Sequence, residues 1–320
     1  MPPHAHKLDL LKASLTDKTF TEYRNNLLQF ISFCEQFNLD FGDAETLDSA
    51  LCDYAHFVFE QTHRDGRQHV NKVVSAVKLL FPAMSKSLFM AHRALSGWAK
   101  SRPSQHLTPV PHDLALGIAY FLRRNRKQDM ALATLLTFDC HFHVNESLRL
   151  TKSCIFMEES PSQKIHIVIE RHKTGANSSV HIRNKLVRAL LVRHLEHFAP
   201  RRQKLFLFSE DAFRGAIHTI MQNDLHLDNP RFVITPHGLR RGGATRDYQL
   251  KRLTIAQIKD RGRWKRDETI YNYVLPASSL AVQQSYGEKT KRILERLNST
   301  AGAFFNVPEV RTGWQEPCCE

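Results

Sequence analysis

Apolar residues recur at three- and four-residue steps through the first third of the chain, from about residue 15 to residue 99. Phe20, Leu27, Phe30 and Phe37 follow this spacing, which places them on one face of a first helix. Similar patterns predict further helices over residues 46 to 62, 67 to 81 and 86 to 99. Because the connections are short, we expect the four amphipathic helices to pack as a small bundle.

A proline-rich stretch from residue 101 to residue 111 interrupts the helical pattern. It contains Pro103, Pro109 and Pro111, and proline blocks helix continuation. We therefore expect four regions, namely a helical domain over 1 to 100, an extended linker over 101 to 111, a second domain over 112 to 300 and a tail over 301 to 320.

The second domain mixes helical and strand patterns. Short β-rich segments occur at residues 154 to 158, 164 to 170 and 178 to 182, and Ile165, Ile167 and Ile169 stand at alternate positions in the second of them. Helices are expected at about 113 to 124, 128 to 150, 184 to 198, 210 to 222, 240 to 250, 254 to 261 and 279 to 297. The predicted fold class is mainly α with a small antiparallel β-sheet, an α+β arrangement.

Composition excludes several classes of protein. At 42% hydrophobic and 24% charged residues the chain is neither disordered nor fibrous. Four of its six cysteines are scattered and two are adjacent in the tail, so no disulfide framework is expected. No apolar run reaches the roughly 20 residues of a membrane helix, and the first residues lack a signal-peptide pattern. We expect an intracellular protein, nuclear in a eukaryote and in the cytoplasm or nucleoid of a bacterium.

The charge balance points to a polyanionic partner. The chain carries 45 Lys and Arg against 32 Asp and Glu, a net charge of +13. Residues 231 to 266 hold eleven basic and two acidic residues, which suits contact with a phosphate backbone. The predicted DNA-binding residues are Arg241, Arg246, Lys251, Arg252, Lys259, Arg261, Arg263, Lys265 and Arg266.

A motif lies within this basic stretch. His237-Gly-Leu-Arg240 is followed by Trp264, and Tyr273 comes nine residues after the tryptophan. In this order and spacing the sequence resembles the tyrosine recombinase (phage-integrase-type) superfamily, and the resemblance implies that Tyr273 is the nucleophile. Tyr271 is the alternative, because residues two apart on a helix point to different sides and only one can face the phosphate. Taken singly, the tryptophan and both tyrosines also suit core packing.

The resemblance extends upstream to about residue 15. Lys173 lies between two predicted strands, where the family carries a catalytic lysine on a β-hairpin. The first family box is an arginine followed, after two residues, by an acid; Glu146 stands at the acid position and His143 at the arginine position. The N-terminal helices resemble the domain with which the family clamps duplex DNA.

The chemistry of DNA strand transfer explains this set of residues. Attack by Tyr273 on a phosphodiester preserves the ester as a 3′-phosphotyrosine, so no cofactor or metal is expected. His237 is suited to accept the tyrosine proton or to donate to the phosphate, and Arg240 to donate two parallel hydrogen bonds to its oxygens. Lys173 is the expected general acid for the departing 5′-oxygen, and Trp264 offers an indole N–H.

His143 leaves the interpretation open. An imidazole has at most two donors, on opposite ring edges, so it does not reproduce a guanidinium clamp, and losing one such donor costs about 10² to 10³ in rate. A metal site at Cys140-His-Phe-His143 is disfavoured because no second ligand pair follows at zinc-finger spacing.

Three functions remain as hypotheses. The first is a site-specific DNA recombinase, similar to eukaryotic mobile-element members of the family, that acts on double-stranded DNA as a self-assembled tetramer, as the resemblance implies. The second is a recombinase-derived protein that binds DNA without cutting it. The third is a regulator in which residues 235 to 275 act like a helix-turn-helix. None of the three involves a membrane.

Overall fold

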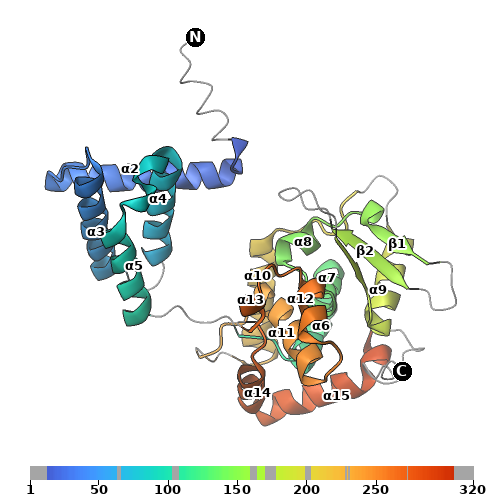
Figure 1. Ribbon diagram of the computed structural model, residues 1–320. Helices are drawn as coiled ribbons and strands as arrows, with labels where there is room; N and C mark the ends of the chain where they lie inside the picture. Colours follow the sequence, from blue (N-terminus) through green and yellow to red (C-terminus); the bar gives the residue numbers. More distant parts are fainter. Residues whose placement is uncertain are drawn as a thin grey trace. The chain divides into compact units, whose positions relative to one another are not determined.

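The computed structural model describes residues 13 to 62, 66 to 102, 108 to 158, 164 to 169, 178 to 198, 203 to 227, 229, 231 to 271 and 273 to 305. The chain divides into two compact units, Met1–Gln105 (unit 1) and His106–Glu320 (unit 2), which are coloured along the sequence in Figure 1. Across the described ranges, no helix has the length and apolar character needed to cross a membrane.

Unit 1 is helical throughout its described part. Its elements are α2 (Asp17–Phe37), α3 (Ala44–Gln61), α4 (Gly66–Leu80), the short 3-10 helix η1 (Pro82–Lys86) and α5 (Phe89–Ser101). Helix α2 packs on α4 and α3 packs on α5, around a core that includes Phe30, Leu51 and Val70. The Asp48 carboxylate accepts the backbone N–H groups of Met90 and Ala91, which satisfies the start of α5. The predicted helices of this region are therefore present.

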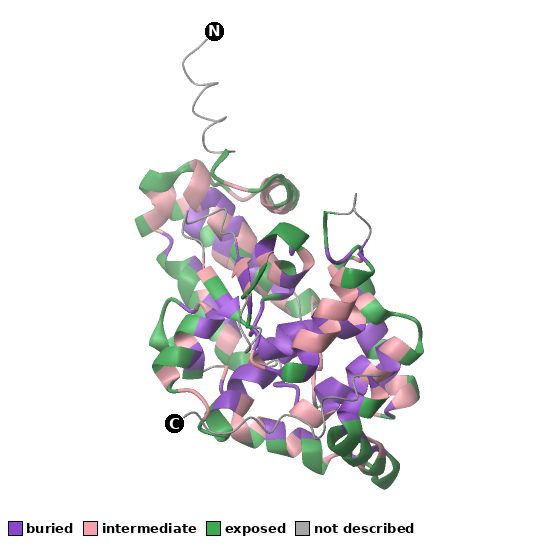
Figure 2. Cartoon of the chain, turned by 90° about the vertical axis from the view of Figure 1, so that its right-hand side faces the viewer, coloured by how far each residue is buried: buried purple, intermediate pink, exposed green. Residues whose placement is uncertain are grey.

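Unit 2 is built on two helices that are buried almost all round, α6 (His112–Arg124) and α7 (Gln128–Asp139). Its other helical elements are α8 (Val144–Leu148), η2 (Lys152–Cys154), α9 (Lys185–Glu196), α10 (Glu210–Thr219), the π-helical turn η3 (Ile220–Asp224), α11 (Pro236–Gln249), α12 (Ile255–Gly262), α13 (Asp267–Tyr271), α14 (Pro276–Gln284) and α15 (Glu288–Phe304). Helices α11 and α9 pack on α7, and α15 packs on α6. Figure 2 shows the buried residues gathered on the inward sides of the helices.

The predicted antiparallel sheet is present in unit 2. Strands β1 (Ile155–Met157), β2 (Ile165–Ile169) and β3 (Ser178–His181) pair in the order β1-β2-β3, both pairs antiparallel. Ile165, Ile167 and Ile169 are buried while the residues between them are partly exposed. The alternation in the sequence therefore identified the face of β2 that meets the core, and the α+β fold class is confirmed.

Two predicted helices are each divided in the structure. The helix expected over residues 128 to 150 ends at Asp139, because His141 takes a left-handed backbone conformation (φ 51°) and His143 caps the new helix α8. The helix expected over 279 to 297 is two helices, since Gly287 caps the start of α15 after a turn that ends α14. Periodicity missed both breaks because apolar residues continue across them.

Structured residues extend into both the predicted linker and the predicted tail. Helix α5 extends to Ser101. Val110 is fully buried, and its backbone N–H donates to the carbonyl oxygen of Gly238 in α11 (3.0 Å). A Cβ at Gly242 would lie 1.9 Å from the carbonyl oxygen of Val110, so only glycine permits this approach. At the other end α15 runs to Phe304, inside the predicted tail.

Candidate active site

The first turn of α11 presents His237 and Arg240. Thr235 and Pro236 set the start of this helix, where proline is favoured because its missing N–H would have no helical partner. The Arg240 side chain is buried, and its Nη2 donates to the carbonyl oxygen of Gly262. Its guanidinium carbon lies 4.7 Å from the centre of the Trp264 ring, so the arginine is held by stacking as well as by hydrogen bonding.

Tyr273 faces this turn of α11. Its hydroxyl lies 3.0 Å from Nε2 of His237, and its ring centre lies 4.9 Å from that of Trp264. The Arg241 guanidinium carbon lies 4.6 Å from the tyrosine ring centre. Tyr271, by contrast, is 64% exposed and lies on the last turn of α13. The geometry thus brings one of the two tyrosines, and not the other, to the histidine.

Trp264 closes the inner side of the cluster. It is 7% exposed and packs with Ala244, Ile258 and Ile270. A Cβ at Gly262 would lie 2.0 Å from the indole ring, so the Gly-x-Trp spacing is needed for the ring to lie against α12. Its Nε1–H is buried without a hydrogen-bond partner among the described residues.

The box that contains His143 lies beside the same cluster. His143 is exposed and caps α8, its Nδ1 accepting the backbone N–H of Asn145 (3.3 Å), while its own backbone N–H donates to Oε2 of Glu146 (2.7 Å). Because Nδ1 acts as an acceptor, the neutral ring carries its proton on Nε2. The ring centres of His143 and His237 are 5.4 Å apart.

The pKa of each histidine is lowered, which favours the neutral ring in both. Burial, with the neighbouring His143, Arg240 and Arg241, lowers the pKa of His237 to about 4. Partial desolvation of the ring by its neighbours and the charge of Arg240 also hold the pKa of His143 below its usual value. A neutral His237 can accept the proton of the Tyr273 hydroxyl or donate to an oxygen beside it, depending on its tautomer.

Two predicted DNA-binding residues, Arg261 and Arg263, have side chains that turn inward. Arg261 donates to the carbonyl oxygens of Asp139 (2.7 and 3.1 Å) and His181 (3.0 Å), and its side chain is 7% exposed. The Arg263 side chain is 2% exposed and binds Glu146. In both arginines all three guanidinium nitrogens donate to groups inside the protein, so we expect neither to contact a DNA phosphate.

The other predicted DNA-binding residues fall into two groups. Lys251, Lys265 and Arg266 are exposed. Arg241, Arg246, Arg252 and Lys259 are partly buried, and the Lys259 ammonium pairs with Asp267 at 2.6 Å. The exposed residues are therefore the most accessible cations of this stretch.

Lys173 lies outside the described residues, so its position relative to Tyr273 stays a prediction. Among the residues that the structure describes, no three or more His, Cys, Asp or Glu side chains are grouped to hold a metal ion. Cys140 and His141 are buried, and the His141 ring lies beside Asp247 (3.2 Å).

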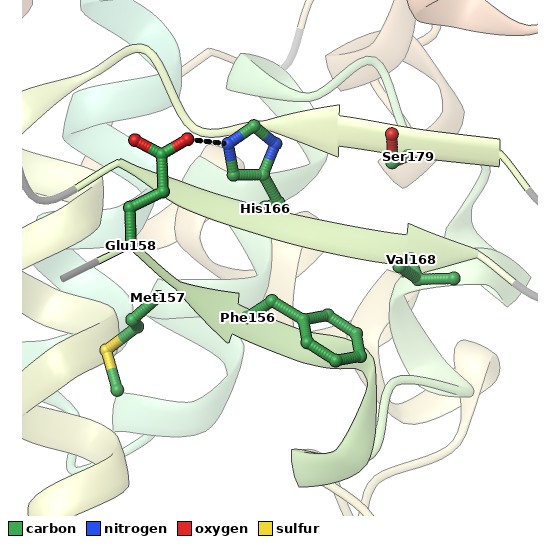
Figure 3. A pocket seen from close by; sticks show the side chains of 6 residues that line it. All are labelled: Phe156, Met157, Glu158, His166, Val168 and Ser179. Carbon is green, nitrogen blue, oxygen red and sulfur yellow. Dashed lines mark hydrogen bonds and ion pairs between the residues drawn. The ribbon is translucent and has the colours of Figure 1, made fainter. Parts of the chain in front are cut away.

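A hollow on the outer face of the sheet is separate from this cluster. Figure 3 shows the six residues that line it, which are Phe156, Met157, Glu158, His166, Val168 and Ser179. His166 and Glu158 bind each other across it at 2.9 Å. None of its residues belongs to the cluster around Tyr273.

Sequence reasoning overlooked how the buried arginines are used. Arg263 was included only for its charge, although it directly follows the glycine of a Gly-x-Trp motif. Its left-handed backbone (φ 57°) at the end of α12 is the feature that turns its side chain inward, and no sequence pattern specifies it. The placement of Arg241 over the Tyr273 ring is also visible only in the structure.

Solved structures of DNA-bound integrases share this fold. The Tn1549 transposon integrase in complex with transposon right-end DNA is 13% identical, with a TM-score of 0.58 over 88% of this chain and 94% of the integrase. A lambda integrase dimer bound to a core site is also 13% identical, with a TM-score of 0.58 over 85% of this chain and 76% of the other. No protein family model and no curated protein matches the chain. The chain therefore has the tyrosine recombinase fold that its sequence motifs resemble.

Proposed function

We propose that the protein is a DNA strand transferase that cuts and rejoins duplex DNA through a 3′-phosphotyrosine on Tyr273. The observation that carries the proposal is the 3.0 Å contact between the Tyr273 hydroxyl and Nε2 of His237, beside Arg240 on the same helix. Tyrosine is a weak nucleophile at neutral pH because its usual pKa is about 10. A neutral imidazole within hydrogen-bond reach is the group that makes its attack feasible.

The proposed reaction is a balanced transesterification. The Tyr273 oxygen forms a bond to phosphorus as the bond from phosphorus to the 5′-oxygen breaks, and the tyrosine proton passes to His237. Arg240 and Trp264 would donate to the non-bridging oxygens, which gain negative charge in the transition state. The 5′-oxygen leaves as a hydroxyl after taking a proton from a general acid, the role that we propose for Lys173. Rejoining is the reverse reaction, so it needs no external energy source.

Duplex DNA is the proposed partner. Exposed Lys251, Lys265 and Arg266 lie in the stretch that follows Arg240, and the chain as a whole carries a net charge of +13. The similar Tn1549 and lambda integrases were both solved in complex with DNA. We also propose that protomers assemble on the DNA as a tetramer, with unit 1 acting as the clamp.

His143 favours a second candidate, a protein that binds DNA without cutting it. The ring stands where the related box has an arginine, and its Nδ1 is occupied by the cap of α8, so it offers one N–H donor at most in its neutral form. We therefore expect slow cleavage, and the DNA-binding candidate becomes the better one if cleavage is absent.

Covalent trapping on nicked DNA tests the proposal. We would incubate the full chain with a library of short duplexes, each nicked and randomised in sequence on both sides of the nick, so that the fragment released by cleavage diffuses away. Wild type is expected to form a protein–DNA adduct that survives denaturation, and Tyr273→Phe is expected to form none. Tyr271→Phe is the matched control and keeps the adduct. Adducts from Tyr273→Phe would refute Tyr273 as nucleophile.

A further inference from the structure

The backbone and side chain of Arg263 are unusual for a residue in a DNA-binding stretch. Arg263 ends α12 in the left-handed region (φ 57°, ψ 35°), which is costly for any residue with a Cβ and is usually taken by glycine. Its side chain is nevertheless 2% exposed. A strained backbone conformation persists only where the surrounding contacts favour it, so the contacts of the Arg263 guanidinium should account for it.

The Arg263 guanidinium binds one carboxylate through two N–H groups. Its Nε donates to Oε1 of Glu146 (3.2 Å) and its Nη2 to Oε2 of the same carboxylate. Nη1 donates to the carbonyl oxygen of Arg261 (2.6 Å) and Nη2 to that of His141 (3.1 Å). A planar fork bound at both carboxylate oxygens fixes the orientation of Glu146, which a point charge does not.

Glu146 in turn contacts both boxes of the candidate active site. Its Oε2 accepts the backbone N–H of His143 (2.7 Å) and lies 3.4 Å from Nη1 of Arg240. The contact to Arg240 is long (3.4 Å), whereas Nη2 of Arg263 lies 2.5 Å from the same oxygen. In the absence of Arg263, we expect Glu146 to be drawn further onto Arg240, which it already contacts, and to turn the Arg240 fork away from a phosphate.

We propose that Arg263 is a positioning residue for strand transfer, which binds Glu146 so that this carboxylate holds the backbone of His143 in place and binds Arg240 only through one long contact. The inference rests on the proposed function and adds a residue to it. Arg263 does not substitute for the arginine absent at position 143, because at least four of its N–H bonds are made inside the protein. It acts on the phosphate only through Glu146.

The charge of Arg263 also governs the ionisation of Glu146. Burial alone would raise the pKa of this carboxyl, but hydrogen bonding and charge from Arg263, with further help from the His143 N–H and Arg240, hold it below its usual value. Removing Arg263 is therefore expected to raise the pKa of Glu146. In the variant, an ionised Glu146 would be drawn further onto Arg240, and a protonated Glu146 would release its cap on His143, so the second effect dominates as the pH falls.

The test compares Arg263→Gln, Arg263→Lys, Glu146→Gln and the double variant Arg263→Gln with Glu146→Gln in the full chain. We would measure the rate of covalent trapping on the selected nicked duplex from acidic to alkaline pH, with the unfolding midpoint of each variant. Arg292→Gln, an exposed arginine on α15, serves as the control. For Arg263→Gln we expect a rate about 10- to 100-fold lower, as for a misplaced catalytic group.

The pH profile separates positioning from a structural role. Arg263→Gln should lose trapping at a higher pH than wild type as the solution is acidified, and this loss should disappear in the double variant. Arg263→Lys should restore the wild-type pH profile, with only part of the rate. A purely structural role would lower the rate equally at all pH values, in step with the folded fraction. That result, or an unchanged rate and profile in Arg263→Gln, would overturn the inference.

A failure of the proposed function gives a different result. If wild type forms no adduct, strand transfer is refuted, and the role of Arg263 is then measured without cleavage, by ¹³C NMR titration of the Glu146 carboxyl in wild type and Arg263→Gln. A higher titration midpoint in the variant supports the control of Glu146 by Arg263. An equal midpoint overturns it.

Discussion

Two pairs of arginines in the same basic stretch face different parts of unit 2. Arg240 and Arg241 lie on α11 with their guanidinium groups 5.9 and 4.6 Å from the Tyr273 ring centre. Arg261 and Arg263, at the end of α12, donate to backbone carbonyls and carboxylates inside unit 2. The sequence gives all four the same charge within a span of 24 residues.

The arginines of this basic stretch therefore have two different roles in the protein. One pair surrounds the tyrosine on which the proposed chemistry depends. The other pair replaces missing backbone hydrogen bonds where α7 ends and the chain turns towards α8, because carbonyl oxygens buried without a donor are costly. The high charge density of residues 231 to 266 is therefore only partly a DNA-binding signal.

The largest expected effect is on folding and concerns Arg261. Its side chain and that of Asp139 are both 7% exposed and 3.5 Å apart. Arg261→Gln would leave a buried carboxylate and two carbonyl oxygens without their cation, which costs about 3 to 5 kcal/mol of unfolding free energy. Urea denaturation measures this, with exposed Arg266→Gln as the control. If Arg261→Gln loses no more unfolding free energy than Arg266→Gln, Arg261 does not stabilise the fold as proposed.

The next effect is on the proposed chemistry and concerns Arg240. Lysine keeps the charge but not the two parallel donors, so Arg240→Lys is expected to slow covalent trapping by about 10² to 10³ while DNA retardation is retained. Trapping kinetics on the nicked duplex measure the loss, and Arg292→Lys is the matched control on an exposed helix face. Wild-type kinetics in Arg240→Lys would remove this arginine from the proposed mechanism.

The sequence predicted the elements that depend on local spacing and missed those that depend on distant contacts. Helices α2 to α5 and the alternation in β2 were predictable, because they depend on local spacing of apolar residues. The breaks at His141 and Gly287 were not, since the first requires a left-handed turn packed against Gly243 and the second a turn between two helices that both continue the apolar pattern. Local spacing carries no information on such tertiary contacts.

The candidate site was predictable in composition but not in arrangement. Motif spacing selected His237, Arg240, Trp264 and Tyr273, which the structure brings together around one contact. It did not separate the arginines beside Tyr273 from those bound to the end of α7, because the partners of Arg261 lie 80 and 122 residues away in sequence. Burial of that kind is decided by the fold and not by the neighbouring residues.

A third prediction concerns the box that lacks an arginine. His143→Arg is expected to raise covalent trapping by about 10²-fold, because a guanidinium adds two fixed donors for the phosphate beside Arg240. Trapping is compared in wild type, His143→Arg and His143→Arg with Tyr273→Phe, and the gain should vanish in the last. If wild type cleaves fast and His143→Arg abolishes cleavage, His143 is a working part of the site and not a defect.

A fourth prediction concerns acid stability and His237. The folded pKa of about 4 lies below the value of about 6.5 in an unfolded chain, so the unfolded state binds the proton first as the pH falls. The stability contributed by neutral His237 is therefore present above pH 6.5 and is lost between about pH 6.5 and 4, by up to about 1.4 kcal/mol per pH unit. His237→Gln should show a flatter pH dependence of unfolding free energy. An identical slope in both proteins would contradict the lowered pKa.

The smallest expected effect is on the salt dependence of DNA binding, in which exposed Lys265 and buried Arg263 should differ. Exposed Lys265 is expected to contact a DNA phosphate, so Lys265→Gln should reduce the salt dependence of DNA binding by about 0.9 in the slope of log affinity against log salt, and Arg263→Gln should leave that slope unchanged. Gel retardation of a fixed duplex over a range of salt measures both.

For wild type, contacts to about six to ten phosphates would weaken binding by about 10³ to 10⁵ between about 50 and 200 mM salt. Equal slope changes in the two variants would mean that Arg263 reaches the DNA, and an unchanged slope in Lys265→Gln would mean that the exposed lysine does not. Either result would break the division between the two groups of cations, because the slope counts phosphates contacted and is insensitive to charges that stay inside the protein.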